Sequence, residues 1–319
     1  MLSDYFAGNN AVVTRLEHLI ASGRMPHAVL LAGESGTGKS ALARLLAEAA
    51  CCKSQNKPCG VCGGCKKAQS GSHPDVRVFN GDGGFKKKDI AEFKYELYLI
   101  PNEADTKVYI FENAWDVSPE VSNALLKALE DPPQRTLFIL TSPSRTKLLP
   151  TIRSRLTEFL LAPVDAKTAA PIVAKAANCE LEQAEETVKA FNGNIGRAIK
   201  YLTDTHFAAD IDLVKSILEA TIAPSSYQLN LLLQSLCSRK RPEIIEFLDL
   251  LFDRTCSALS AKTSKTERRQ AGIPEGFELK ISTDRLVKIC DSISDSKTYF
   301  AANCSSSALM LTLAAQIRA

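Results

Sequence analysis

The segment from Gly33 to Ser40 fills the pattern G-x-x-x-x-G-K-[ST], which is typical of loops that bind nucleotide phosphates. Glycines let successive backbone N–H groups turn inward around phosphate oxygens, and the helix that follows adds a favourable dipole. In this pattern the lysine reaches the outer phosphates, and the serine offers its hydroxyl to Mg²⁺. The alternative is a glycine-rich turn without a ligand. We predict that ATP or ADP with Mg²⁺ is bound by Gly33, Gly36, Thr37, Gly38, Lys39 and Ser40.

Hydrolysis of a bound nucleotide needs carboxylates at the end of a neighbouring strand, to hold the metal and to polarise the attacking water. The apolar run 108–111 ends in Glu112-Asn113. Glu112 can serve the metal, whereas the carboxamide of Asn113 cannot accept a proton from water at neutral pH. We therefore predict nucleotide binding with weak or absent hydrolysis. A polar strand end without a catalytic role is the alternative.

Five of the ten cysteines fall between Cys51 and Cys65, which is too uneven a distribution for a framework of disulfides. Cys59, Cys62 and Cys65 are separated by two residues each, with glycines between them that permit tight turns. Either Cys51 or Cys52 can complete a tetrahedral site of four thiolates. Because such a site has no open position, we predict structural Zn²⁺.

Other interpretations of this cysteine cluster are weaker. The spacing of a bacterial ferredoxin would require a further cysteine where Gln69 stands. His73 is a conceivable ligand, but Pro74 follows it and favours a turn. Free thiols at this density would be a chemical liability on a protein surface.

These motifs need elements that hold them in place, and the first half of the chain supplies a strand pattern. Short apolar runs alternate with segments long enough for helices, which predicts a parallel sheet covered on both faces. One of these runs precedes the phosphate loop and a helical segment follows it. The five runs are residues 28–32, 76–79, 108–111, 137–140 and 157–160.

The second half of the chain, beyond residue 162, has a helical pattern to its end. We predict an α/β nucleotide-binding domain at 1–162 with a zinc module at 51–65, a helical lid at 163–205 and a helical oligomerisation domain at 206–319.

The composition limits what the protein can be. Its 319 residues are 45% hydrophobic and 24% charged, enough to bury a core. A net charge of +3 is too small to draw the whole surface onto nucleic acid or anionic lipid. We expect a cytoplasmic protein, since there is no membrane-spanning run and no basic segment followed by an apolar one at the start.

A cysteine cluster directly after the helix of a phosphate loop is an unusual combination, and it resembles the clamp-loader branch of the AAA+ ATPases. Further matches are residues 25–28 (MPHA), 73–76 (HPDV), 122–133 (SNALLKALEDPP) and 148–155 (LLPTIRSR). The resemblance implies an AAA+ P-loop parallel sheet, a helical lid and an all-helical collar domain. It also implies a subunit of the bacterial DNA polymerase III holoenzyme, a DNA-directed DNA polymerase that acts in DNA replication.

The family's Ser-Arg-Cys motif carries an arginine that reaches into the ATP site of the adjacent subunit. Ser154-Arg155 matches the start of this motif, although Leu156 replaces the cysteine. The resemblance thus implies that Arg155 is an arginine finger acting in trans. A surface ion pair is the other interpretation of this arginine.

The family's first zinc cysteine, counted from the phosphate-loop lysine, falls at Cys52. Cys51 is then a buried neighbour. The zinc ligands implied by the resemblance are Cys52, Cys59, Cys62 and Cys65.

Two departures separate this chain from the active motor subunits of the family. Those subunits have Asp-Glu where Glu112-Asn113 stands here, and an arginine of their lid aligns with Gly196. Arg197 follows, but a shift of one residue turns a helical side chain by about 100° and directs it elsewhere.

The resemblance implies a stator-like subunit in a hetero-oligomer with gamma/tau-type ATPase and delta subunits. It would give Arg155 to a neighbouring ATPase while a sliding clamp is loaded onto primed DNA. The alternative is a self-sufficient ATPase motor subunit of gamma/tau type. A zinc-dependent DNA-binding module is a third possibility, disfavoured by the near-neutral charge.

Overall fold

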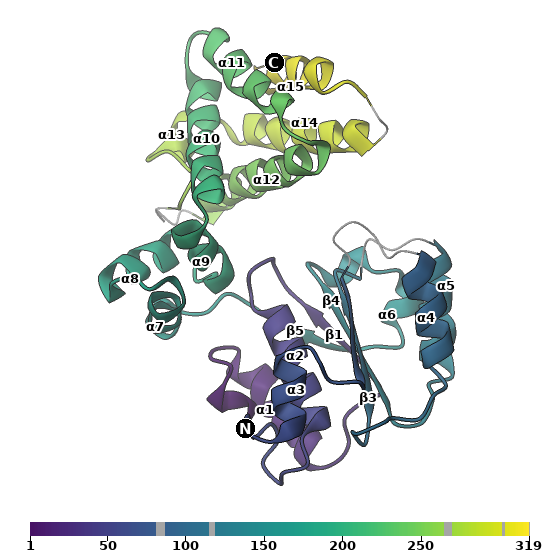
Figure 1. Ribbon diagram of the computed structural model, residues 1–319. Coiled ribbons are helices and arrows are strands. Elements are labelled where there is room, and N and C mark those ends of the chain that lie inside the picture. Colours follow the sequence, from purple (N-terminus) through teal and green to yellow (C-terminus); the bar gives the residue numbers. More distant parts are fainter. Residues whose placement is uncertain (81–86, 115–118, 265–269, 302–303, 319) are drawn as a thin grey trace. The chain divides into compact units, whose positions relative to one another are not determined.

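The fold is taken from a computed structural model, in which contacts between Cα atoms divide the chain into two compact units (Figure 1). The first unit comprises 1–172 and 194–197, and the second comprises 173–193 and 198–319. The structure describes residues 1–80, 87–114, 119–264, 270–301 and 304–318.

A five-stranded, fully parallel sheet forms the centre of the first unit, in the order β2-β3-β4-β1-β5. Each apolar run of the sequence is one of its strands, so the predicted α/β class with a parallel sheet is confirmed. The strands are β1 (Ala28–Ala32), β2 (Val76–Asn80), β3 (Lys107–Glu112), β4 (Thr136–Ser142) and β5 (Thr157–Leu160).

Strand β1 shows why the central runs are continuously apolar. All five of its residues are buried, because helices cover both faces of a parallel sheet. Val29 and Leu31 point into one core cluster, and Leu30 points into the other. The side chains alternate between the two cores with the period of two that a strand imposes.

The helices of the first unit lie in two layers around the sheet (Figure 1). One layer holds α1 (Asn10–Ala21), α2 (Lys39–Cys51) and α3 (Gly63–Gln69), and the short η1 (Leu2–Asp4) contributes Leu2 to the core there. The other layer holds α4 (Lys87–Glu96), α5 (Pro119–Glu130) and α6 (Pro150–Arg153), with η2 (Arg145–Lys147) between β4 and α6.

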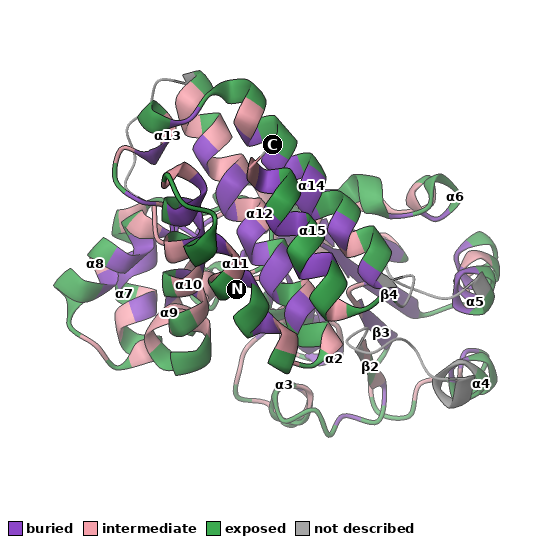
Figure 2. Ribbon diagram, turned by 90° about the horizontal axis from the view of Figure 1, so that it is seen from above, coloured by how far each residue is buried: buried purple, intermediate pink, exposed green. Residues whose placement is uncertain are grey.

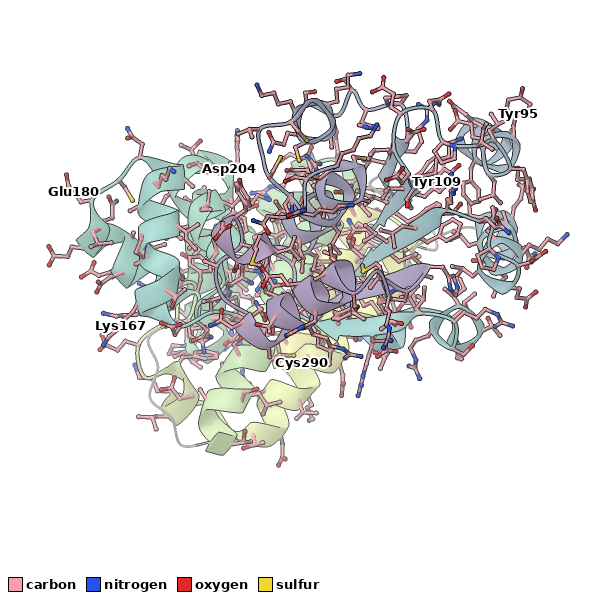
Figure 3. All side chains as sticks on the ribbon, turned by 90° about the horizontal axis from the view of Figure 1, so that it is seen from below. Tyr95, Tyr109, Lys167, Glu180, Asp204 and Cys290 are labelled. Atoms are coloured by element: carbon pink, nitrogen blue, oxygen red, sulfur yellow. The ribbon has the colours of Figure 1, made fainter. Side chains whose placement is uncertain are left out.

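An aromatic cluster fills the core between the sheet and α4. Tyr109 of β3 is fully buried, 5.2 Å from the ring centre of Phe93 in an edge-to-face arrangement and 5.6 Å from that of Phe138 in a stacked one. Figure 3 shows the contrast between Tyr109, inside the unit, and Tyr95, which extends from α4 at its edge. Such pairs contribute about 0.5–1.5 kcal/mol each beyond their buried area.

In the described part of the second unit, the secondary structure is helical. Asp204 caps the N-terminus of α10, since its carboxylate accepts hydrogen bonds from the N–H groups of His206 (2.9 Å) and Phe207 (3.2 Å). The helices that form or enter this unit are α7 (Ala166–Ala177), α8 (Leu181–Ala190), α9 (Ile195–Thr203), α10 (Thr205–Ile222), α11 (Tyr227–Ser235), η3 (Leu236–Ser238), α12 (Arg241–Ser264), α13 (Phe277–Lys280), α14 (Thr283–Ala301) and α15 (Ser306–Arg318).

Burial follows the amphipathic pattern of these helices, with buried residues along one side and exposed residues along the other (Figure 2). Among the described residues, no helix is both long enough and apolar enough to cross a membrane. The domain boundaries at 162 and 205 stay predictions.

Candidate functional site

The phosphate loop, residues 33–40, joins the end of β1 to the start of α2, as the sequence predicts. Gly36 (φ +90°) and Gly38 (φ +88°) adopt left-handed conformations that side chains with a Cβ rarely take. The hydroxyl and the N–H of the buried Thr37 both donate to the Glu34 carbonyl, at 2.8 and 3.3 Å. Helix α2 begins at Lys39, so its N-terminus faces the loop, with Ser40 exposed.

Lys39 is the buried cation of this loop. Its Nζ donates to the carbonyl oxygens of Gly33 (2.7 Å) and Glu34 (2.6 Å). The pKa of Lys39 is lowered to about 8, mainly by burial; the Glu34 carboxylate raises it, and the positive charge of Arg197 adds to the lowering. The charge of Arg197 thus acts on the phosphate-loop lysine, and the direction of its side chain stays a prediction.

The low pKa gives nucleotide binding a predicted pH dependence. Lys39 is an ammonium below about pH 8 and neutral above it, so the affinity for a non-hydrolysable ATP analogue should fall as the pH rises past 8. Lys39→Ala should weaken binding at neutral pH by about tenfold or more, the value of one charge-assisted hydrogen bond, and should flatten the profile. Calorimetric titration checks both, with the exposed Lys53→Ala as control. An unchanged affinity in Lys39→Ala would refute the role.

A segment far away in sequence, residues 194–197, braces the outside of the phosphate loop. The buried Asn194 donates through Nδ2 to the carbonyl of Ser35 (2.7 Å), and the N–H of Gly196 donates to the carbonyl of Gly36 (2.9 Å). The Ser35–Gly36 and Gly36–Thr37 peptide bonds are trans, so in each of them the N–H points in the direction opposite to the carbonyl. The N–H of Gly36 consequently points away from the brace, the orientation an anion-binding loop needs, while the N–H of Thr37 donates to Glu34 within the loop.

The brace requires glycine at 196. A Cβ there would lie 2.6 Å from the Cα of Gly36 and 2.8 Å from its carbonyl oxygen. The position that carries an arginine in the family's motor subunits thus has no room for any side chain in this arrangement.

Gly196→Ala is therefore expected to destabilise the protein by about 1–3 kcal/mol, the usual range for an overpacked contact, and to lower the affinity for the ATP analogue. Chemical unfolding measures the first effect and calorimetry the second. Gly63→Ala is the matched control, because a Cβ at Gly63 meets nothing within 4 Å. Equal stability of the two variants would show that residue 196 is free to move.

Glu112 lies at the carboxyl end of β3, next to the helix that follows the phosphate loop. Its side chain is 12% exposed, and Oε1 is 3.6 Å from the guanidinium of Arg44 on α2. The next residue, Asn113, takes a left-handed φ of 54°, and its N–H donates to the hydroxyl of Thr141 (3.0 Å). The structure thus brings Glu112 to the phosphate-loop helix, and its role toward Mg²⁺ stays a prediction.

Arg155 lies at the amino ends of the parallel strands, whereas the phosphate loop lies at their carboxyl ends. It precedes β5, whose first residue, Thr157, pairs with Val29 near the start of β1, whereas the loop follows the end of β1. A strand of this length separates the two edges by about 16 Å, at about 3.3 Å per residue. Arg155 therefore cannot serve the phosphate loop of its own chain.

The guanidinium of Arg155 is held in place but remains one-third exposed. One nitrogen donates to the carbonyl of Thr151 (2.6 Å) and to the hydroxyl of Ser154 (3.3 Å). The other nitrogen donates to a carboxylate oxygen of Glu130, the last residue of α5, at a distance of 2.6 Å. This arrangement orients the group while leaving part of it open to solvent.

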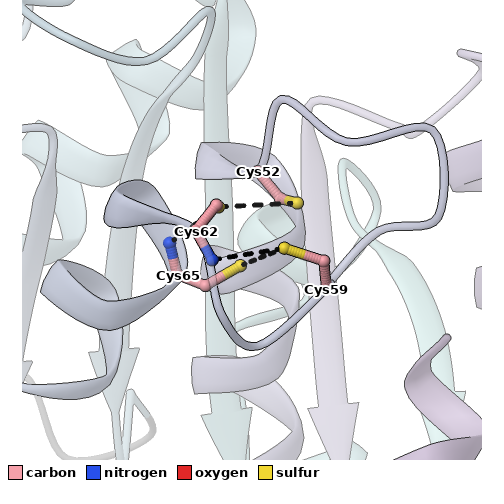
Figure 4. A group of neighbouring side chains, drawn as sticks. All are labelled: Cys52, Cys59, Cys62 and Cys65. Atoms are coloured by element: carbon pink, nitrogen blue, oxygen red, sulfur yellow. Dashed lines mark hydrogen bonds between the residues drawn. The ribbon is translucent and has the colours of Figure 1, made fainter.

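The structure brings together four cysteines of the cluster (Figure 4). Their Sγ atoms all lie within 4.8 Å of one another; the Cys59–Cys65 and Cys52–Cys62 pairs are 4.0 and 3.9 Å apart. Zinc bonds of about 2.3 Å in a tetrahedron place sulfurs about 3.8 Å apart, so the four thiols fit Zn²⁺. With four sulfur ligands, the ion would be structural.

The electrostatics around the cluster favour thiolate at its outer edge. The N–H groups of Val61 and Cys62 lower the pKa of Cys59 to about 6. Burial raises the pKa of Cys65 and that of Cys51, the latter to about 12. Cys51 lies outside the group of four.

Two further contacts hold the module around this cluster. The hydroxyl of Tyr5 donates to the carbonyl of Cys59 (3.1 Å), which ties the N-terminal segment to the module. The ring nitrogen Nδ1 of the buried His73 accepts the N–H of Asp75 (3.1 Å), and His73 does not belong to the group of four. His73 thus stabilises its own turn.

Some residues of the site escape the sequence patterns. Asn194 contacts the phosphate loop and Thr141 contacts the residue after β3, although both are distant from these sites in the sequence. Glu130 lies within a segment that matches the family, but its contact with Arg155 spans 25 residues. The one available signal was a polar residue at the end of an apolar run, which Thr141 shares with Glu112.

The strand order, the phosphate loop after β1 and the helical region beyond residue 162 together define a nucleotide-binding P-loop protein of the AAA+ type. Residues 8–165 match the protein-family model described as DNA polymerase III, delta subunit. The matched segment, about half of the chain, belongs to this clamp-loader family.

The similarity extends to individual members. DNA polymerase III subunit delta' of Bacillus subtilis is 35% identical over 158 residues, 49% of this chain and 48% of that protein. DNA polymerase III subunit tau of the same organism is 28% identical over 255 residues, 77% of this chain and 45% of that protein. The matched region thus spans less than half of each relative. Among solved structures, the Thermotoga maritima RuvB Holliday junction branch migration motor aligns with a TM-score of 0.48 and 20% identity, over 73% of this chain and 83% of that one.

Proposed function

We propose that this chain is a clamp-loader subunit of delta prime type. It acts as a stator in a hetero-oligomer with gamma/tau-type ATPase and delta subunits, and gives Arg155 in trans to the ATP site of its neighbour. The assembly loads a sliding clamp onto primed DNA during replication, and the chain meets clamp and DNA through that assembly. A cytoplasmic location stays a prediction.

The observation that supports this proposal is the placement of Arg155. It lies on the edge of the sheet remote from its own phosphate loop, partly exposed and oriented by Thr151 and Glu130. An arginine so placed can stabilise developing charge only on phosphates bound to another subunit.

The chain's own site is proposed to bind nucleotide without efficient hydrolysis. When bound, Mg²⁺ would neutralise phosphate charge. Lys39 and the loop N–H groups would hold the phosphates, with Ser40 and Glu112 on the metal side. Asn113, however, offers no carboxylate to accept a proton from water, and Glu112 faces Arg44.

The test is the turnover of ATP by the isolated chain, for which we expect no more than slow hydrolysis. The similarity to a tau subunit over 255 residues favours the second candidate, a self-sufficient motor subunit. Robust hydrolysis that Lys39→Ala abolishes would establish the motor and reject the stator. Co-purification with the other loader subunits tests the assembly in either case.

A further inference from the structure

Two cysteines outside the zinc module lie face to face between two long helices of the second unit. The Sγ atoms of Cys256 on α12 and Cys290 on α14 are 3.6 Å apart. Cys290 is 8% exposed and Cys256 is half-buried, so Cys256 is the more exposed residue of the pair. Figure 3 labels Cys290.

The register of the two helices fixes this approach. Lys297 of α14 forms an ion pair with Asp249 of α12. Seven residues further along α12 and seven residues back along α14, Cys256 meets Cys290. The helices are therefore antiparallel, and the cysteines lie two turns from the ion pair on the same seam.

A second contact holds the other end of the seam. The ammonium of Lys262, near the end of α12, donates to the carbonyl of Glu278 in α13 (2.8 Å) and to that of Ile281, two residues before α14. With contacts on both sides, the thiols are positioned by two packed helices (Figure 1).

We infer that Cys256 and Cys290 are a reversible oxidation site that takes up a disulfide oxidant, such as oxidised glutathione, and forms a cross-link between α12 and α14. A disulfide needs the two sulfurs about 1.6 Å closer than they are, which small rotations of the side chains can supply. The inference does not depend on the proposed function.

The two thiols have different roles in the exchange. The hydrogen bond between them lowers the pKa of Cys256 and raises that of Cys290, so Cys256 is the first thiolate. It attacks one sulfur of oxidised glutathione, whose S–S bond breaks, and one glutathione leaves as a thiolate that takes up the proton lost by Cys256. The thiolate of Cys290 then attacks the Cys256 sulfur and releases the second glutathione. Two thiols are oxidised, and one oxidised glutathione is reduced to two thiols.

The experiment treats the full-length, zinc-loaded chain with oxidised glutathione, blocks remaining thiols and maps tryptic peptides by mass spectrometry. We expect a disulfide-linked pair of peptides, residues 255–262 with 289–297, that dithiothreitol separates. The exposed Cys304 is the internal control: glutathione on Cys304 measures how readily an exposed thiol of this chain reacts with the oxidant.

Two variants test the order of the steps. In Cys290→Ser, the glutathione adduct should remain on Cys256, whereas in Cys256→Ser no adduct should form at Cys290. Glutathione on Cys304 or Cys256 of the unmodified sequence, without the linked peptides, would overturn the inference. Because the main readout uses the natural chain, a variant that fails to fold would not affect it.

Discussion

Replacing Arg155 by alanine is expected to slow ATP hydrolysis by about a thousandfold at the neighbouring site it faces in a reconstituted loader, the lower end of the range for arginine fingers. The reason is geometric. Arg155 stands before β5, at the edge of the sheet away from its own phosphate loop, so its charge is available to another subunit. DNA-stimulated ATPase activity and clamp loading are the two measurements.

The neighbouring Arg153 supplies the matched control. It is also partly exposed, but it contacts Glu158, 3.5 Å away on β5. Arg153→Ala removes the same charge from the same short segment and should leave hydrolysis nearly unchanged. Glu130→Gln provides an intermediate case, since it keeps the shape of the partner of Arg155 and removes its charge. If Arg155→Ala and Arg153→Ala behave alike, the finger is not Arg155.

The first unit contains the elements that the sequence predicts best. Its three central strands, β1, β3 and β4, were predictable because they are buried on both faces, so apolar composition alone marks them. The phosphate loop and the cysteine cluster were predictable because their chemistry depends on residues within a few positions of each other.

The brace on the phosphate loop could not be predicted in the same way. The bond from Asn194 to Ser35 spans 159 residues, and no local pattern records it. Sequence reasoning treated Gly196 as the loss of a lid arginine. The structure gives that glycine a positive role, since only a residue without a Cβ lets the backbone reach Gly36.

The electrostatic effect of Arg197 on Lys39 escaped the sequence for a related reason. A shift of one residue does turn a helical side chain by about 100°. Residues 194–197, however, pack directly against the phosphate loop, so a charge there acts on Lys39 whatever its exact direction.

The zinc module gives the second large expected effect, and it separates two adjacent cysteines. Cys52→Ser should lower the affinity for zinc by more than about a hundredfold, because changes that merely disturb a ligand already cost 10–100-fold. Its Sγ belongs to the group of four and lies 3.9 Å from that of Cys62. Zinc content after dialysis against a weak chelator, with the melting temperature, measures the loss.

Cys51→Ser is the matched control, one residue away on the same chain. The Sγ atoms that lie within 4.8 Å of one another belong to Cys52, Cys59, Cys62 and Cys65, so the thiol of Cys51 is not needed for a tetrahedral site. This variant should therefore retain one zinc ion per chain. A melting temperature that falls together with the zinc in Cys52→Ser makes the ion structural. Loss of zinc with unchanged melting would show that the module folds without it, and loss in Cys51→Ser alone would move the first ligand back by one residue.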